Sequence, residues 1–131
     1  MKRDWDVIRS ILLAVEEEKD LLTLIPERAG DEQIISTSQG QLLGDDVLCG
    51  HIKLLVDTGM IEGVSASHSY GQWLYNCRRP MLTMKGHDLI DTLRPVGMPQ
   101  KLAKFANERG FELTLDTIKA VFGAFVGSVL A

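Results

Sequence analysis

Apolar residues recur three and four positions apart near the start of the chain, at Trp5, Ile8, Ile11, Leu12 and Val15. This spacing places them on one stripe of a helix. Asp4 precedes the stripe and Asp6 adds negative charge to the first turn, so we expect Asp4 to cap the helix. Residues 16–18 are all acidic, which opposes the dipole at a helix C-terminus, so the helix should end there.

The next segments are less regular until a second clear helix begins. Gln33–Thr37 predicts a short strand, and the pair Leu42–Leu43 predicts one turn of a poorly formed helix. A long helix then starts near Asp45 or Asp46 and ends at Gly59, where a left-handed residue is expected after the last turn. The apolar positions expected on its buried side are Val47, Leu48, Ile52, Leu55 and Val56.

An alternating pattern follows that helix. Ile61–Ser67 and Gln72–Leu82 predict two antiparallel strands, with residues 69–71 at the tip of the hairpin. The alternation puts Trp73, Tyr75 and Cys77 on one face, and Leu74, Asn76 and Arg78 on the other. Three more helices are expected after it: one capped by Thr83 and running to Leu93, one over residues 99–109, and a last one opened by Thr114 or Asp116.

A helix that stops at a glycine and passes through Met60 and Ile61 into a hairpin is how winged-helix domains pass from their third helix to the wing. The order of elements predicts a mainly α fold with a small β-hairpin wing (α+β), a winged helix-turn-helix with extra C-terminal helices. We expect a winged-helix domain over residues 1–94 and a helical extension over residues 95–131. The length of 131 residues and the 24% of charged residues are typical of an ordered globular chain.

Several motifs resemble the domain-of-unknown-function family 2513: Met1–Arg9, His51–Leu55, Gly59–Ile61, Leu82–Asp91 and Leu115–Phe122. The resemblance covers nearly the whole chain. Met84 stands where the family commonly has Trp, and Leu89 where it commonly has Phe. The resemblance implies a winged-helix fold and a frequent origin in phages or prophages, and it implies no activity and no functional residues.

Charge is unevenly distributed along the chain. Residues 1–66 carry 13 acidic and 6 basic side chains, a net charge of −7, whereas residues 67–131 have a net charge of +3. A protein held on DNA by phosphate contacts should present a dense basic face. The candidate contacts to double-stranded DNA are Lys53 and His51 on the helix before the hairpin, and Arg78, Arg79 and Lys85 in and after it.

The same helix also carries Asp45, Asp46 and Asp57, which would repel phosphate and would suit a basic protein partner. Two hypotheses therefore stay open. In the first, the chain is a phage or prophage regulator that binds DNA as a dimer. In the second, it is a protein-binding winged-helix module, for example a phage inhibitor of a host nucleic-acid-binding defence complex.

The last expected helix is apolar over more than one face and contains small residues four positions apart. Small residues permit close helix approach. We expect a homodimer contact formed by Phe122, Gly123, Phe125, Val126, Gly127 and Val129. Packing of this helix inside its own chain and contact with a membrane surface are the alternatives.

We expect no enzyme, cofactor or metal. No Gly-rich phosphate loop or Gly-x-Ser-x-Gly motif occurs. His87, near Asp88 and Asp91, lacks a second ligand pair, so a structural hydrogen bond is expected for it, with Gly86 allowing close backbone approach. Cys49 and Cys77 have no ligand spacing and should be free thiols. The N-terminus has no apolar run of a signal peptide, and Ala120–Ala131 is shorter than the roughly 20 residues of a membrane span, which favours a cytoplasmic protein.

Overall fold

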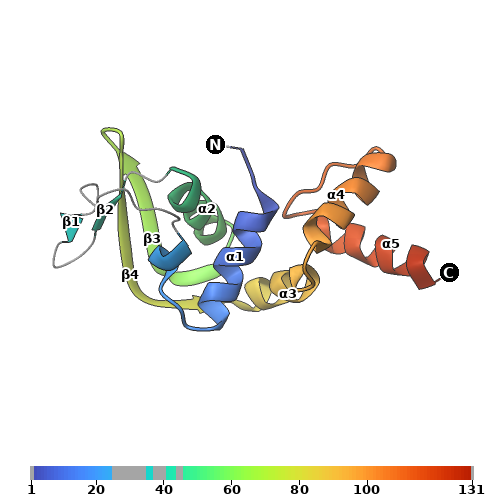
Figure 1. Cartoon of the computed structure of the whole chain (residues 1–131), viewed down its shortest axis with the longest axis horizontal. Coiled ribbons are helices and arrows are strands. Elements are labelled where there is room, and N and C mark those ends of the chain that lie inside the picture. Colours follow the sequence, from blue (N-terminus) through green and yellow to red (C-terminus); the bar gives the residue numbers. More distant parts are fainter. Residues whose placement is uncertain (1, 25–34, 37–40, 44–45, 131) are drawn as a thin grey trace. The chain divides into compact units, whose positions relative to one another are not determined.

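The computed structural model describes residues 2–24, 35–36, 41–43 and 46–130. The chain divides into two compact units, Met1–His87 and Asp88–Ala131, and each is described by itself. The elements in chain order are α1 (Trp5–Glu16), the 3-10 helix η1 (Leu21–Leu24), β1 (Ile35–Ser36), β2 (Gln41–Leu43), α2 (Asp46–Asp57), β3 (Ile61–Ser69), β4 (Gln72–Leu82), α3 (Met84–Leu93), α4 (Met98–Glu108) and α5 (Ile118–Leu130) (Figure 1). The mixed α+β class expected from the sequence is confirmed.

The N-terminal cap of α1 is confirmed. The Asp4 carboxylate accepts hydrogen bonds from the backbone N–H groups of Asp6, at 2.9 Å, and Val7, at 3.3 Å. The two bonds satisfy donors that the first helical turn leaves without partners. The apolar stripe faces inward as predicted, although Trp5 is only half-buried; its fully or nearly fully buried members are Ile8, Ile11, Leu12 and Val15.

The strands form one antiparallel sheet in the order β1-β2-β4-β3. The hairpin of β3 and β4 matches the predicted one, and its turn uses Tyr70 at φ 52° and Gly71 at φ 77°. Two consecutive positive φ values are typical of a type I′ turn, whose twist fits a hairpin. In the first unit α2 packs against β3, and α1 lies beside β4 (Figure 1).

The helical turn expected at Leu42 and Leu43 is wrong. Both residues belong to β2, where Leu42 pairs with Leu74 and Leu43 with Trp73. Two adjacent leucines carry no period, so their pattern fits a helix or a strand equally well. The neighbouring strand β4 decides between them because it offers backbone partners to an extended segment. The strand expected over Gln33–Thr37 is confirmed at Ile35–Ser36, and its other residues lie outside the described part of the chain.

An irregularity interrupts the hairpin ladder near its base. Glu62 pairs with Met81 and Val64 pairs with Cys77, so Gly63 alone faces three residues of β4, namely Arg78, Arg79 and Pro80. Gly63 has φ +79°, and a Cβ atom there would overlap the carbonyl oxygen of Arg79. Only glycine fits that conformation and that approach. The bulge also gives Pro80 a place where its missing N–H does not break a regular ladder.

The end of α2 follows the predicted glycine stop. Gly59 has φ +78°, its N–H donates to the carbonyl oxygen of Val56 at 3.0 Å, and the N–H of Met60 donates to that of Leu55 at 2.8 Å. These two bonds define a Schellman motif. The predicted buried face of α2 needs one correction, because Val47 is 51% exposed. The helix turns Cys49 and His51 inward instead, beside Leu48, Ile52 and Leu55.

Thr83 caps α3 as expected, because its hydroxyl accepts a hydrogen bond from the Gly86 N–H at 3.1 Å. The same hydroxyl donates to the carbonyl oxygen of Gly59 at 2.5 Å, which ties the start of α3 to the end of α2. The close backbone approach predicted at Gly86 is confirmed, since a Cβ there would overlap the carbonyl oxygen of Met60. The end of the hairpin and the start of α3 are therefore held by the Thr83 hydroxyl and by the close backbone approach at Gly86.

In the second unit α4 packs against α5. The rings of Phe105 and Phe125 meet edge to face, with centroids 5.5 Å apart and planes at 86°. Helix α5 begins at Ile118 rather than directly after Thr114, because the intervening residues form a turn. In that turn the Thr114 hydroxyl accepts a hydrogen bond from the Thr117 N–H at 3.1 Å.

Candidate interaction surfaces

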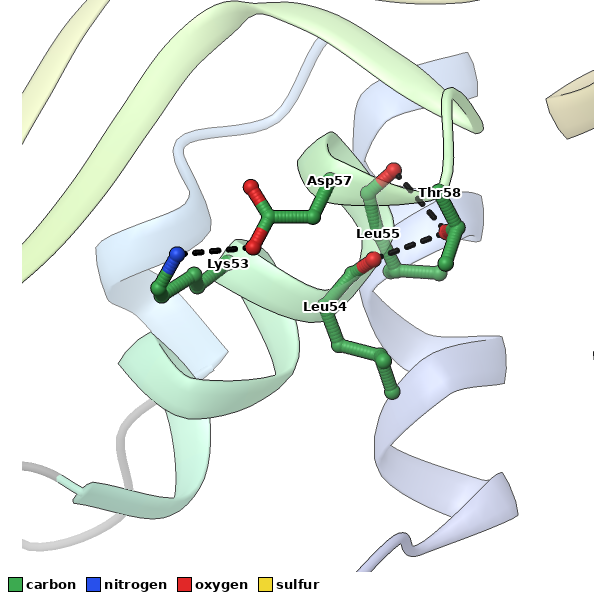
Figure 2. Close-up of polar contacts among 5 residues, drawn as sticks. All are labelled: Lys53, Leu54, Leu55, Asp57 and Thr58. Carbon is green, nitrogen blue, oxygen red and sulfur yellow. Dashed lines mark hydrogen bonds and ion pairs between the residues drawn. The ribbon is translucent and has the colours of Figure 1, made fainter.

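The exposed side of α2 carries a local ion pair. The Lys53 ammonium lies 2.7 Å from an Asp57 carboxylate oxygen, one helical turn away, and the two side chains are 48% and 57% exposed (Figure 2). At the end of the helix, the Thr58 hydroxyl donates to the carbonyl oxygen of Leu54 at 2.7 Å. Such an exposed pair contributes little to stability, but it neutralises the one cationic candidate on this helix face.

His51 does not lie on that surface. It is 0% exposed, its Nε2 accepts a hydrogen bond from the Asp4 N–H at 2.8 Å, and its Nδ1 lies 2.6 Å from the carbonyl oxygen of Val47. The carbonyl can only accept, so Nδ1 is the donor in this contact and Nε2 is the acceptor in the other. The expectation that His51 reaches a DNA groove is wrong for this structure, because the ring is buried, with Nε2 joining α2 to the start of α1 and Nδ1 facing a carbonyl of α2 itself. Its helical spacing from Leu48 and Leu55 was the signal for burial.

The acidic candidates of α2 have partners inside the first unit. The Trp73 indole N–H donates to an Asp46 carboxylate oxygen at 2.7 Å, which joins the start of α2 to β4. The Trp73 ring also meets the His68 ring edge to face at 5.0 Å. Asp57 pairs with Lys53, and Asp45 lies outside the described residues. The two described acids therefore already serve structural contacts, although both stay exposed to solvent.

Arg78 and Arg79 lie apart from the surface of α2. Both are exposed at the bulge opposite Gly63, and neither forms an ion pair with another described residue. They line a groove of about 810 Å³ between β4 and the segment that joins α1 to η1. The described residues that line it include none of α2; they are Val15, Glu16, Glu18, Lys19, Asp20, Leu21, Leu22, Tyr75, Cys77, Arg78, Arg79, Pro80, Met81, Leu82 and His87.

One residue that lines the groove, Tyr75, has a buried hydroxyl. Tyr75 is 3% exposed, and its hydroxyl makes no hydrogen bond with the described residues. Burial raises the pKa of Tyr75 strongly, and a weak contact with the Cys77 thiol and the negative charge of Asp20 raise it further. The hydroxyl therefore remains protonated at neutral pH and can donate a hydrogen bond. A tyrosine on the inward face of an alternating strand was its only sequence signal, since the hydroxyl needs a partner when the ring is buried.

The remaining basic candidates are solvent-exposed. Lys85 is exposed in the first turn of α3. His87 is also exposed and lines the groove, so the structural hydrogen bond expected for its side chain is not found among the described residues. The structure thus brings Arg78, Arg79 and His87 together along one groove. Lys53 lies outside this groove, paired with Asp57 on α2.

Helix α5 has one covered side and one open side. Ile118 and Val121 are buried, whereas Val129 is 65% exposed. A Cβ atom at Gly123 or Gly127 would meet nothing within 4 Å. Of the predicted dimer residues, the half-buried ones are Phe122, Phe125 and Val126. Part of the apolar surface therefore packs within the unit, and the small residues face outward.

No group of three or more His, Cys, Asp or Glu side chains among the described residues is placed to hold a metal ion. Among the helices of the described part, none combines the length and the apolar character needed to cross a bilayer.

Residues 2–112 match the family described as Hypothetical protein (DUF2513). An Uncharacterized protein of Haemophilus influenzae is 31% identical over 138 residues, and the match covers 100% of both chains. The chain belongs to the DUF2513 family, which confirms the resemblance seen in its motifs. No solved structure matches the chain.

Proposed function

We propose that the chain is a winged-helix regulator of the phage or prophage type that binds double-stranded DNA as a dimer. Support for the fold comes from the order of elements in the first unit, where α2 passes through a Schellman motif into the hairpin of β3 and β4. In this arrangement α2 corresponds to the recognition helix and the hairpin to the wing.

One observation carries the choice of DNA. The bulge opposite Gly63 presents two adjacent arginines to solvent without an ion-pair partner among the described residues. Guanidinium groups bind phosphate oxygens well because their donors form a planar fork. Lys85 adds a third exposed cation just after the hairpin.

The expected binding mode is phosphate contact with little reading of bases. The described surface of α2 offers Lys53, whose charge is neutralised by Asp57, and His51 is buried. Specific readout needs several Arg, Lys, Asn or Gln side chains at base edges. Affinity should therefore depend strongly on salt and weakly on DNA sequence.

The open side of α5 supports the dimer. Gly123 and Gly127 lie about one helical turn apart, and a Cβ atom at either position would meet nothing within 4 Å. Val129, later in the same helix, is exposed. Exposed small residues allow a second helix to approach closely, and the apolar neighbours would be removed from water by it. A two-fold contact between two α5 helices would satisfy both features.

The test is the salt dependence of binding to a 30-base-pair duplex, measured by fluorescence anisotropy. Two or three phosphate contacts give a slope of log K against log salt of about −2 to −3. Arg78→Ala combined with Arg79→Ala should bring this slope roughly two units closer to zero. The matched control is Lys101→Ala combined with Lys104→Ala, which removes the same charge from exposed positions of α4. Equal loss in both double variants, or no binding at low salt, would contradict the proposal.

A protein partner is the second candidate, and the surface of α2 favours it. Asp46 and Asp57 outnumber Lys53 there, and Val47 is 51% exposed beside Asp46. A basic protein, such as a host nucleic-acid-binding complex that a phage protein would inhibit, fits this chemistry. Asp57→Lys separates the two candidates: it should strengthen DNA binding and weaken capture of a protein partner from host lysate.

A further inference from the structure

The groove beside β4 has walls of opposite charge. Glu18 and Asp20 line it from the segment between α1 and η1, and Arg78 and Arg79 line it from β4. Neither arginine forms an ion pair with a described residue, so the two walls do not neutralise one another directly. Lys19, on the acidic wall, already pairs with Glu17 at 2.7 Å.

The Tyr75 hydroxyl is a second and independent feature of this groove. It is buried, belongs to a lining residue, and has, beside the weak contact with the Cys77 thiol, no hydrogen-bond partner among the described residues. Buried polar groups are nearly always hydrogen-bonded, so each exception calls for an explanation. Because burial keeps this phenol protonated, an acceptor oxygen of a ligand would satisfy it.

The charges narrow the ligand class. A small anion inside the groove would meet the two arginines favourably but would be repelled by Glu18 and Asp20, and an uncharged ligand would leave both walls uncompensated. A molecule with a carboxylate at one end and an ammonium at the other satisfies both. The volume of about 810 Å³ falls within the roughly 300–1,000 Å³ of small-molecule sites and holds a short peptide.

We propose that this groove binds a small zwitterion, an amino acid or short peptide with free termini. Its carboxylate is held by Arg78, Arg79 and the Tyr75 hydroxyl, and its ammonium faces Glu18 and Asp20. This inference goes beyond the proposed function, since it requires neither DNA nor a dimer.

The first experiment is calorimetric titration of the full chain with L-alanine, dialanine and trialanine. At least one of the three should bind with a dissociation constant of 10 mM or below, an order of magnitude set by one charged contact at each end. For the probe that binds, acetylation of its amine and amidation of its carboxylate should each weaken binding at least tenfold. Absence of binding by all three probes at 10 mM, or equal binding of the blocked forms, overturns the proposal.

The second experiment removes one oxygen atom. Tyr75→Phe should fold as the parent does, because the lost hydroxyl has no described partner, and should bind the probe several-fold more weakly. Arg78→Ala combined with Arg79→Ala should abolish binding, whereas Lys101→Ala with Lys104→Ala should leave it unchanged. Probe affinity of Tyr75→Phe equal to that of the parent overturns the assignment. Since Tyr75 is buried, the DNA affinity of the Tyr75→Phe variant should be unchanged. That result separates binding in the groove from the proposed DNA binding.

Discussion

Glycines in two regions of this chain have opposite surroundings. In the first unit, Gly63 and Gly86 are each pressed against a backbone carbonyl, so that a Cβ atom would overlap it. In α5 of the second unit, Gly123 and Gly127 face open space. The first pair is required by the fold, because removing the side chain is what lets the backbones meet. The second pair is not required by anything that the unit itself contains.

The difference separates residues that shape the protein from residues that are available to a partner. Gly63 makes the bulge that exposes Arg78 and Arg79, and Gly86 lets α3 start against the end of α2. A helix with outward glycines loses helical propensity for no gain inside its own unit. That loss is explained if a second copy of α5 packs over them.

The largest effect is expected for Gly63→Ala. The new methyl group would overlap the carbonyl oxygen of Arg79, and the residue would have to keep φ +79°. We expect a loss of about 3 to 4 kcal/mol in the free energy of unfolding, measured by urea denaturation. Gly71→Ala is the matched control, because it has φ +77° with nothing within 4 Å, and should lose only about 1 kcal/mol. Similar losses in the two variants would contradict the role of the close approach.

The second largest effect is expected for His51→Ala, with a loss of about 3 kcal/mol in the free energy of unfolding. The change removes a fully buried ring and leaves the Asp4 N–H without its acceptor. Lys53→Ala, on the exposed side of the same helix, should change stability by a few tenths of a kcal/mol at most, because its ion pair is exposed. If the His51→Ala variant were as stable as the parent but bound DNA more weakly, the result would contradict the burial of His51 and indicate an exposed DNA contact.

Gly86→Ala is expected to cost about 2 kcal/mol. Its methyl group would overlap the carbonyl oxygen of Met60, and the start of α3 would have to move away. Lys85→Ala in the same turn is exposed and should be nearly neutral in urea denaturation. A neutral result for Gly86→Ala would show that α3 is not held against the end of α2.

Gly123→Leu has the smallest expected effect on folding. No described atom lies within 4 Å of the new Cβ, and leucine is a better helix former by up to about 1 kcal/mol, so stability of the monomer should be equal or higher. The bulky side chain should nevertheless break the proposed dimer, which analytical ultracentrifugation measures. Ala103→Leu on the exposed side of α4 is the control and should remain dimeric. A dimer that survives Gly123→Leu, or a parent that sediments as a monomer, would count against the α5 contact.

Local patterns predicted most of the elements. The caps at Asp4 and Thr83, the stop at Gly59 and the turn near Gly71 each depend on a few neighbouring residues, and the structure confirms them. The predictions failed where residues distant in the sequence decide the conformation or the burial of a segment. Leu42 and Leu43 are extended because β4 lies beside them, and Val47 is exposed although it fits the apolar face of α2.

The candidate sites could be predicted only in part. Arg78 and Arg79 were visible as cations on a strand, but their place in a groove with Tyr75 depends on a bulge that pairs Gly63 with three residues of β4. Residues far apart along the chain line that groove, and no periodicity relates them. Likewise, the exposed side of α2 and the exposed side of α5 each depend on which residues of the same unit pack over the rest of the helix.

The amino-acid sequence by itself determined most of the helices and strands, the caps at Asp4 and Thr83, the stop at Gly59, and the family, because these depend on short-range spacing and backbone preferences. Only the tertiary structure decided which polar groups remain available. It buried His51 between two backbone partners, paired Lys53 with Asp57, and left Arg78 and Arg79 exposed beside a buried phenol. The physical reason is that desolvation and pairing are properties of the surroundings that packing creates, and a residue's neighbours along the chain do not specify them.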